Sequence, residues 1–177
     1  LVDRVDDARD AQEDASEQFA DALEQFRAFV EVDAGDLEKT YDRLNAEYER
    51  SVADAEEVRE RIDDVERVAE DLFEEWQDEL DDYSRADLRR DSERLLRDTR
   101  SRYANLMAAM RRAEQSMDPV LEAFEDNVLV LKHNLNARAI GALRGELADI
   151  ERNTEQLIER MNEAIREADA FIASLES

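Results

Sequence analysis

Apolar residues recur at alternating spacings of three and four along most of the 177-residue chain. Over positions 37–83 this apolar stripe consists of Leu37, Tyr41, Leu44, Tyr48, Ala55, Val58, Ile62, Val65, Ala69, Leu72, Trp76 and Tyr83, with polar interruptions at Ser51 and Glu79. Such spacing places the apolar side chains on one face of a helix, as in helices that pack in coiled-coil fashion. The stripe therefore predicts long helices that each bury one face against other helices.

Composition favours an all-helical fold. The chain has only three Gly and one Pro, and 41% of its residues are charged, which is typical of long helices with wide solvated faces. It contains no Cys, which excludes a disulfide framework and a thiolate metal site. No apolar stretch approaches the ~20 residues that a membrane-spanning helix needs.

Turn signals divide the stripe into four helices connected by short turns. The expected ranges are 1–32, 37–82, 85–134 and 137–175. Helices joined by short turns pack as antiparallel neighbours. We therefore predict a single all-α domain over residues 1–177, an elongated antiparallel up-down-up-down bundle of four long helices with coiled-coil-like heptad packing.

Local signals suggest where these helices begin and end. Gly35 is suited to ending the first helix, and Asp36 to capping the second. Ser84 followed three residues later by Asp87 has the spacing of a capping box, which predicts the start of the third helix. Pro119 lies inside the third helix, where it either restarts a helix or kinks a continuous one. The stripe passes Pro119 almost unchanged, which favours a kink near that residue.

The remaining helices carry comparable stripes. In the first helix the stripe consists of Val5, Ala8, Ala15, Phe19, Ala22, Phe26 and Phe29, with Gln12 as its polar exception. Leu88 begins the stripe of the third helix, and Trp76 and the tyrosines are expected in the core. Gly141 and Gly145 form a small-residue pair that predicts a close helix crossing. The first helix is about fourteen residues shorter than the second. Part of the second stripe therefore lacks a cover, unless upstream residues or a second chain supply one.

The charge distribution gives a further constraint. Residues 53–82 contain fifteen Asp or Glu and three Arg, whereas residues 85–112 contain nine Arg and four acidic residues. An antiparallel hairpin at Ser84 would lay these segments side by side, so that the third helix partly neutralises the second. The formal net charge of −25 argues against nucleic acid and anionic lipid as partners.

No pattern in the chain identifies a catalytic, cofactor-binding or metal-binding residue. A di-iron carboxylate bundle requires Glu-x-x-His motifs, but position 130, three residues before the single histidine, is Val. The acidic run at 74–82 lacks the loop that gathers oxygen ligands around Ca²⁺, and is expected to be a solvated helix face opposite the Arg-rich segment. The candidate partner contacts lie in the last turn: Lys132, His133, Asn134 and Asn136. Helix capping accounts equally well for the two Asn residues.

Four segments of the chain, 35–38, 41–45, 88–93 and 129–137, resemble a family of bacterial proteins catalogued as domain of unknown function 2959. The run Leu131-Lys132-His133-Asn134-Leu135-Asn136-Ala137 is the most specific of them, and the resemblance covers essentially the whole chain. It implies a secreted or lipid-anchored envelope protein, in the periplasm or anchored to the outer membrane. It also implies a signal segment and a lipidated Cys upstream of Leu1. The resemblance implies no activity and no functional residues.

Three functions are compatible with these observations. The first is a non-enzymatic helical scaffold or protein-interaction module of the bacterial cell envelope. The second is a self-assembling envelope-stress or structural protein, whose helices complete a bundle with another copy. The third is an enzyme or a metal-binding bundle, which would need a concave polar pocket that a slender bundle seldom offers. The first requires no cofactor, and its partner is a protein.

Overall fold

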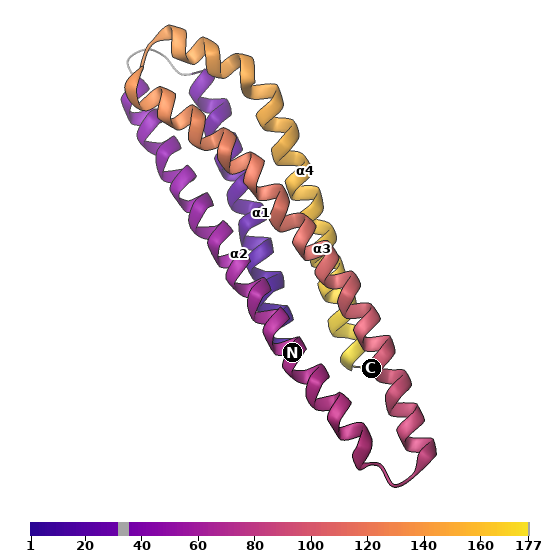
Figure 1. The fold of residues 1–177 in the computed structure, drawn as a ribbon. Coiled ribbons are helices and arrows are strands. Elements are labelled where there is room, and N and C mark those ends of the chain that lie inside the picture. Colours follow the sequence, from indigo (N-terminus) through magenta and orange to yellow (C-terminus); the bar gives the residue numbers. More distant parts are fainter. Residues whose placement is uncertain (32–35, 177) are drawn as a thin grey trace.

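The computed structural model describes residues 1–31 and 36–176. These residues form four long helices and one short 3-10 turn (Figure 1). The elements are α1 (Val2–Val30), α2 (Leu37–Glu79), η2 (Leu80–Asp82), α3 (Ala86–His133) and α4 (Ala137–Glu176). No strand occurs among the described residues, so the predicted all-α fold is confirmed for this part of the chain.

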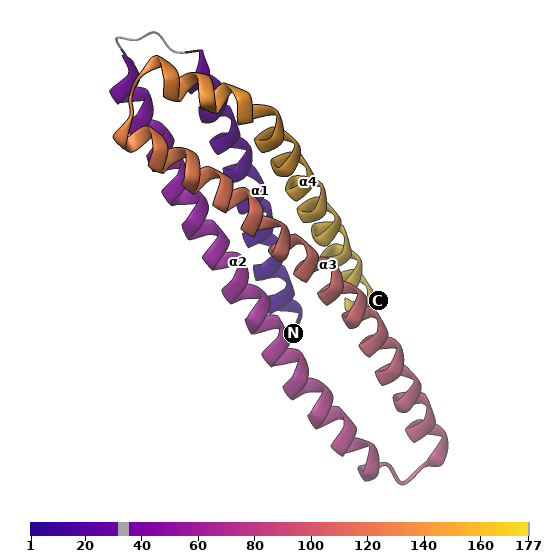
Figure 2. The ribbon, with the colours of Figure 1, turned by 45° about the horizontal axis from the view of Figure 1, so that its top comes forward.

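The four helices lie along one long axis. The turn between α3 and α4 lies at the same end as the end of α1 and the start of α2, and the turn between α2 and α3 lies at the other end (Figures 1 and 2). α1 contacts α2 and α4, and α3 contacts the same two helices. The helices therefore enclose one core, in which each has two close neighbours.

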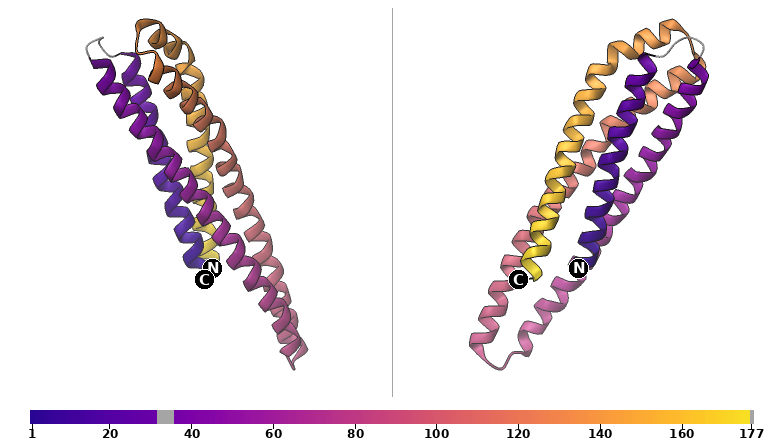
Figure 3. Two further views of the ribbon diagram at one scale, coloured as in Figure 1. Left: turned by 60° about the vertical axis from the view of Figure 1, so that its left-hand side comes forward. Right: turned by 180° about the vertical axis from the view of Figure 1, so that it is seen from behind.

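Both chain termini lie partway along the molecule (Figure 3). Beyond them only α2 and α3 continue, joined by the turn that follows η2 (Figure 1). We call this projecting helical hairpin, residues 70–99, the arm. The length difference between the first two helices had predicted that part of α2 would lack a cover, and the arm contains that part.

The core consists of the apolar stripes of the four helices. Every member of the predicted stripe of α1 is fully buried, as are Ile62 in α2, Met110 in α3 and Leu157 in α4. Phe124 of α3 lies at the centre of an aromatic cluster, with ring centroids 4.8 Å from Phe26 and 6.1 Å from Phe19. Burial of these rings contributes a large share of the hydrophobic stabilisation.

Polar residues within the stripes are accommodated by bonds to the preceding helical turn. Ser51 donates its hydroxyl to the carbonyl of Glu47 at 2.9 Å, and Thr154 donates to Ile150 at 2.7 Å. Such bonds to the carbonyl four residues earlier satisfy a buried hydroxyl without a partner on another helix. Gln12 is different, because its amide nitrogen and oxygen are both buried and have no hydrogen-bond partner among residues 1–31 and 36–176.

α3 runs without interruption through Pro119. The alternative in which Asp118 and Pro119 restart a helix is therefore wrong. Met117 and Val120, on either side of the proline, are both buried. The packing of the stripe thus holds α3 together at a position where proline removes one backbone hydrogen bond.

The predicted helix caps are only partly present. The prediction of a capping box at Ser84 is wrong, because the N-cap of α3 is Arg85 and its side chain makes no capping hydrogen bond. Asp87 instead accepts hydrogen bonds from the Arg85 guanidinium, at 3.2 Å from Nε and 2.5 Å from Nη2, so it does not reach back to the helix start. Asp36 is the N-cap of α2 but makes no side-chain cap bond. Gly35 lies outside the described residues.

The close helix crossing predicted at Gly141 and Gly145 is also wrong. Both residues are exposed, and a Cβ atom added to either would meet nothing within 4 Å. They lie on the solvent side of α4, whereas Leu143 between them is buried. Spacing alone does not distinguish a small residue at a helix contact from one on the solvated face.

We expect Gly141→Ala and Gly145→Ala each to raise the free energy of unfolding by about 0.5–1 kcal/mol, because Gly in a helix interior has more backbone freedom to lose than Ala. Ala142→Gly, at the exposed position next to Gly141, is the matched control and should lower stability by a similar amount. Urea unfolding monitored by circular dichroism measures all three. A loss of stability in either Ala variant would contradict the open surroundings of these glycines.

Candidate protein-interaction surface

The two helices of the arm are held together by a small core of their own. Phe73, Leu80 and Leu96 are buried between them. Trp76 donates its indole Nε1–H to the hydroxyl of Ser92 at 2.8 Å, which links the two helices. The two helices of the arm are therefore joined by contacts of their own.

One face of the arm continues the surface that α1 and α4 cover within the bundle. Val65 of α2 and Leu106 of α3 are fully buried there. Leu72 follows Val65 by seven residues, and Leu95 precedes Leu106 by eleven, so each pair shares one face of its helix. Beyond Val2 of α1 and Glu176 of α4, no helix of the described residues covers this face of the arm (Figures 1 and 3).

Four apolar side chains lie on this face, which we call the arm face: Leu72, Trp76, Leu88 and Leu95. Leu72 and Trp76 are half-buried, whereas Leu88 is 42% exposed and Leu95 55%. Tyr83, in the turn that follows η2, is 43% exposed. The expectation of a core position is therefore wrong for Tyr83 and Leu88, whereas Trp76 is half-buried and packs against the core of the arm. The spacing of Leu88 continues the core stripe, but no described helix covers it there.

Leu95 is the arm-face residue that the sequence analysis did not identify. It is adjacent to Leu96, which lies in the stripe and is buried between the two helices. Two neighbouring leucines on a helix point about 100° apart, so only one of them can occupy the stripe. The signal available in the sequence is the seven-residue spacing from Leu88 to Leu95, which runs parallel to the core stripe.

The outer side of α2 in the arm is a row of exposed carboxylates. None of these six residues takes part in an ion pair among the described residues: Asp71, Glu74, Glu75, Asp78, Glu79 and Asp82. The expected match to the Arg-rich segment is only partly present. Arg89 pairs with Asp81 at 3.3 Å, and Arg111, within the bundle, pairs with Glu66 at 2.6 Å. The exposed Arg90 and Arg97 lie on the far side of α3 from Leu88 and Leu95, whereas the exposed Arg94 is adjacent to Leu95 and points about 100° away from it.

An aromatic and cationic cluster joins the arm to the bundle. The guanidinium of Arg100 lies 5.6 Å from the ring centroid of Phe73, and Tyr103 meets the same ring edge-on at 5.3 Å. Tyr103 also approaches Phe171 near the end of α4, at 6.5 Å between centroids. Burial, reinforced by the carboxylates of Glu66 and Glu70, raises the pKa of Tyr103 to about 12.

This pKa predicts a pH dependence of stability. Because the pKa of Tyr103 in the folded protein exceeds its ordinary value of about 10, the protonated phenol stabilises the fold fully below pH 10. That contribution is lost as the pH rises from about 10 towards 12. We expect urea unfolding to show this fall between pH 10 and 12, and Tyr103→Phe to reduce it. Tyr83→Phe, at the exposed arm tyrosine, is the control; an equal effect of both variants would contradict the assignment to Tyr103.

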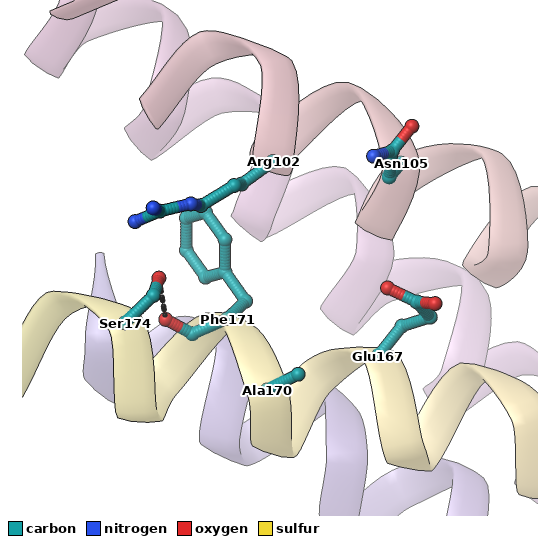
Figure 4. Close-up of a pocket in the computed structure, with 6 residues that line it drawn as sticks. All are labelled: Arg102, Asn105, Glu167, Ala170, Phe171 and Ser174. Atoms are coloured by element: carbon teal, nitrogen blue, oxygen red, sulfur yellow. Dashed lines mark hydrogen bonds between the residues drawn. The ribbon is translucent and has the colours of Figure 1, made fainter. Parts of the chain in front are cut away.

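A shallow hollow of about 350 Å³ lies between α3 and the end of α4 (Figure 4). In it the Arg102 side chain lies beside the Phe171 ring, and Ser174 donates to the Phe171 carbonyl at 2.7 Å. Glu167 is seven residues from Ser174, or about 10 Å along the helix axis, which is too far to activate its hydroxyl. The hollow therefore presents no arrangement for nucleophilic catalysis among the residues that line it.

The turn containing the predicted partner contacts lies at the end opposite the arm (Figure 2). Asn136 accepts a hydrogen bond from the Ala139 backbone at 2.9 Å, and Asn134 donates to the Val130 carbonyl at 3.3 Å. Both Asn side chains thus serve as helix caps. Lys132 and His133, at the end of α3, are exposed. The structure therefore separates this turn into two capping residues and two exposed residues.

The described residues contain no group of three or more His, Cys, Asp or Glu side chains placed to hold a metal ion. Within the same residues, no helix is both long enough and apolar enough to cross a membrane.

This arrangement defines an all-helical protein with a four-helix body and a projecting two-helix arm. The chain matches the family model described as protein of unknown function (DUF2959) over residues 1–175, and it belongs to that family. Comparison with curated proteins and with solved structures gives no match. The family places the fold in a group of related chains without assigning it an activity.

Proposed function

We propose that this protein is a non-enzymatic helical interaction module of the bacterial cell envelope, which binds a protein partner through its arm. In this proposal the helices form an antiparallel up-down-up-down bundle with coiled-coil-like packing. The bundle serves as a scaffold that holds the arm away from its own surface. The envelope location is supported by the family resemblance, whose members look like secreted or lipid-anchored proteins.

The observation that carries the proposal is the arm face. Apolar side chains exposed together on a defined, two-helix projection are typical of a surface that a partner covers. Scattered single apolar residues on a surface need no such explanation. Here four occur on one face, and that face continues a helix-packing surface.

The proposal is tested by copurification of the tagged full-length protein from native envelope membranes. We expect one partner at fixed stoichiometry with the wild type, and its loss with the double variant Leu88→Gln/Leu95→Gln. The matched control is Leu129→Gln/Val130→Gln, which changes two exposed apolar residues on α3 at the opposite end of the molecule. Recovery of the partner with the arm variant but not with the control variant would contradict the proposed role of the arm.

A further inference from the structure

We infer that α1 opens in sections: the part of the helix around Gln12 separates from the bundle while the phenylalanine part stays packed. We call residues 8–16 of α1 the opening section and residues 19–30 the anchoring section. The inference goes beyond the proposed function, because it concerns a movement within the bundle and not a partner of the arm. It is carried by three features of the opening section, each of which weakens its contacts with the neighbouring helices.

The first feature is the side chain of Gln12 itself. Gln12 is fully buried, and neither polar atom of its amide has a hydrogen-bond partner in the described part of the chain. The amide therefore retains the cost of leaving water, and it regains its hydrogen bonds with water when this section of the helix separates. Opening around Gln12 is thus favoured over opening elsewhere along α1.

The second feature is the small size of the core residues. The buried apolar residues of the opening section are Ala8, Ala11 and Ala15. Those of the anchoring section are Phe19, Ala22, Leu23, Phe26, Phe29 and Val30. An Ala side chain buries far less apolar area than Phe or Leu, and the free energy of burial rises with that area. Separation of the opening section therefore costs much less hydrophobic free energy than separation of the anchoring section.

Contacts on either side of the opening section place it against α2. Before the section, Arg61 of α2 pairs with Asp7 at 4.0 Å, and after it Gln18 donates to the hydroxyl of Ser51 at 3.4 Å. Residues 52–60 of α2 lie between these two contacts. This stretch of α2 therefore lies beside the opening section.

The third feature is a like-charge contact between these two stretches. Asp54 of α2 is half-buried, and its pKa is raised by burial and by the nearby carboxylates of Asp14 in the opening section and Glu57 in α2. No ion pair among the described residues neutralises Asp54 or Asp14. The two charged carboxylates repel each other across the contact, and the repulsion is relieved when the section separates.

Only weak contacts oppose this separation. Arg9 of the opening section pairs with Asp169 of α4 at 2.5 Å, on the surface, where ion pairs contribute little to stability. Separation uncovers Ala55 and Val58, two fully buried residues of the helix that continues into the arm. The movement therefore enlarges the accessible apolar surface of α2 while the aromatic cluster around Phe124 stays intact.

Labelling of buried thiols in the folded, full-length protein tests the inference. Ala8, Ala15 and Ala22 are fully buried and lie seven residues apart, so they occupy one face of α1. Residues 1–177 contain no Cys, so each of the single variants Ala8→Cys, Ala15→Cys and Ala22→Cys places one thiol in this part of the protein. Mass spectrometry of the α1 peptide measures its reaction with a thiol reagent. We expect the first two variants to react about tenfold faster than the third, because reaction requires local separation of the helix.

Further substitutions distinguish opening of a section from opening of the whole helix. Gln12→Met should slow labelling at positions 8 and 15 by about tenfold, because Met has no amide that regains hydrogen bonds on opening. Phe26→Leu, in the anchoring section, should accelerate labelling at position 22 and leave positions 8 and 15 unchanged. Circular dichroism shows whether each variant is folded. If Ala8→Cys does not fold, Ala11→Cys takes its place, since Ala11 is also buried.

Asp54→Asn tests the contribution of the carboxylates. It should slow labelling at positions 8 and 15 by about twofold to fivefold, because it removes the repulsion with Asp14. Glu56→Gln is the matched control, because Glu56 is an exposed residue of α2 that forms no ion pair among the described residues. The control should leave the labelling rates unchanged.

Equal labelling rates at the three positions of α1 would overturn the inference. An equal acceleration at all three positions by Phe26→Leu would also overturn it, because α1 would then open as one unit. A slowing by Glu56→Gln as large as that by Asp54→Asn would contradict the like-charge contact, since it would show a general effect of the net charge.

Discussion

Replacement of Phe124 by Ala is expected to lower the free energy of unfolding by about 3–5 kcal/mol, the largest loss from a single substitution that we predict. Phe124 is fully buried, and its ring stacks on Phe26 at 4.8 Å and lies 6.1 Å from Phe19. It thus joins α3 to α1, two helices that otherwise contact each other little. Truncation would leave a cavity that all four helices enclose, so neighbouring side chains have little freedom to fill it.

Phe73→Ala is the matched control. Phe73 is also a buried phenylalanine, but it lies in the arm, where only two helices pack and solvent is close. We expect a clearly smaller loss, because the site can collapse or admit water. Chemical denaturation of both variants, monitored by circular dichroism, measures the difference. An equal or larger loss for Phe73→Ala would show that the arm contributes as much to stability as the centre of the bundle.

Replacement of Gln12 by Met is expected to have the second largest effect, a gain of about 1–3 kcal/mol. The Gln12 amide is fully buried on α1, and neither of its polar atoms has a hydrogen-bond partner. A buried polar group without a partner retains the cost of its desolvation, and Met has a similar length without that cost. The helix propensities of Gln and Met are nearly equal, so the gain in stability would come from the change in the buried core and not from a change in helix propensity.

Gln18→Met is the control within the same helix. Gln18 donates to the Glu47 carboxylate at 2.8 Å and to the Glu47 carbonyl at 3.1 Å, which connects α1 to α2. The same chemical change there removes hydrogen bonds that are made, so it should lower stability by about 0.5–1.5 kcal/mol. Thermal and urea unfolding of the two variants should therefore differ in sign. A loss of stability for Gln12→Met would indicate that an internal water satisfies the Gln12 amide.

The buried part of the fold could be predicted from the sequence because burial follows the helical repeat directly. Every residue assigned to the first stripe, including Gln12, is buried. The same rule failed in the arm at Leu88, which continues the repeat but which no described helix covers. Periodicity identifies the face of a helix that is suited to packing, but it does not show whether another helix lies against that face. The rule also failed at Gly145, because small residues suit a helix contact and an exposed position alike.

The candidate site was accessible to sequence reasoning only in part. The unequal lengths of the first two helices predicted an uncovered stretch of α2, which the arm contains. The turn at Lys132 and His133 was recognised by its residue types, although the structure assigns its Asn residues to capping. The exposure of the acidic run at 74–82 was predicted, but not that Glu75 and Glu79 form no ion pair among the described residues, because their distance from basic side chains depends on how α3 is rotated about its axis.

The contact between α1 and α4 has a consequence for how the chain folds during synthesis. Ion pairs join Arg9 to Asp169 at 2.5 Å and Arg27 to Glu151 at 2.8 Å, across sequence separations of 160 and 124 residues. The hairpin at the α2–α3 turn, in contrast, joins Trp76 to Ser92 over 16 residues, so it can close early. The phenylalanine stripe of α1 lacks its α4 neighbours until the 40 residues of α4 have left the ribosome. The nascent chain is therefore prone to aggregation until α4 has been synthesised.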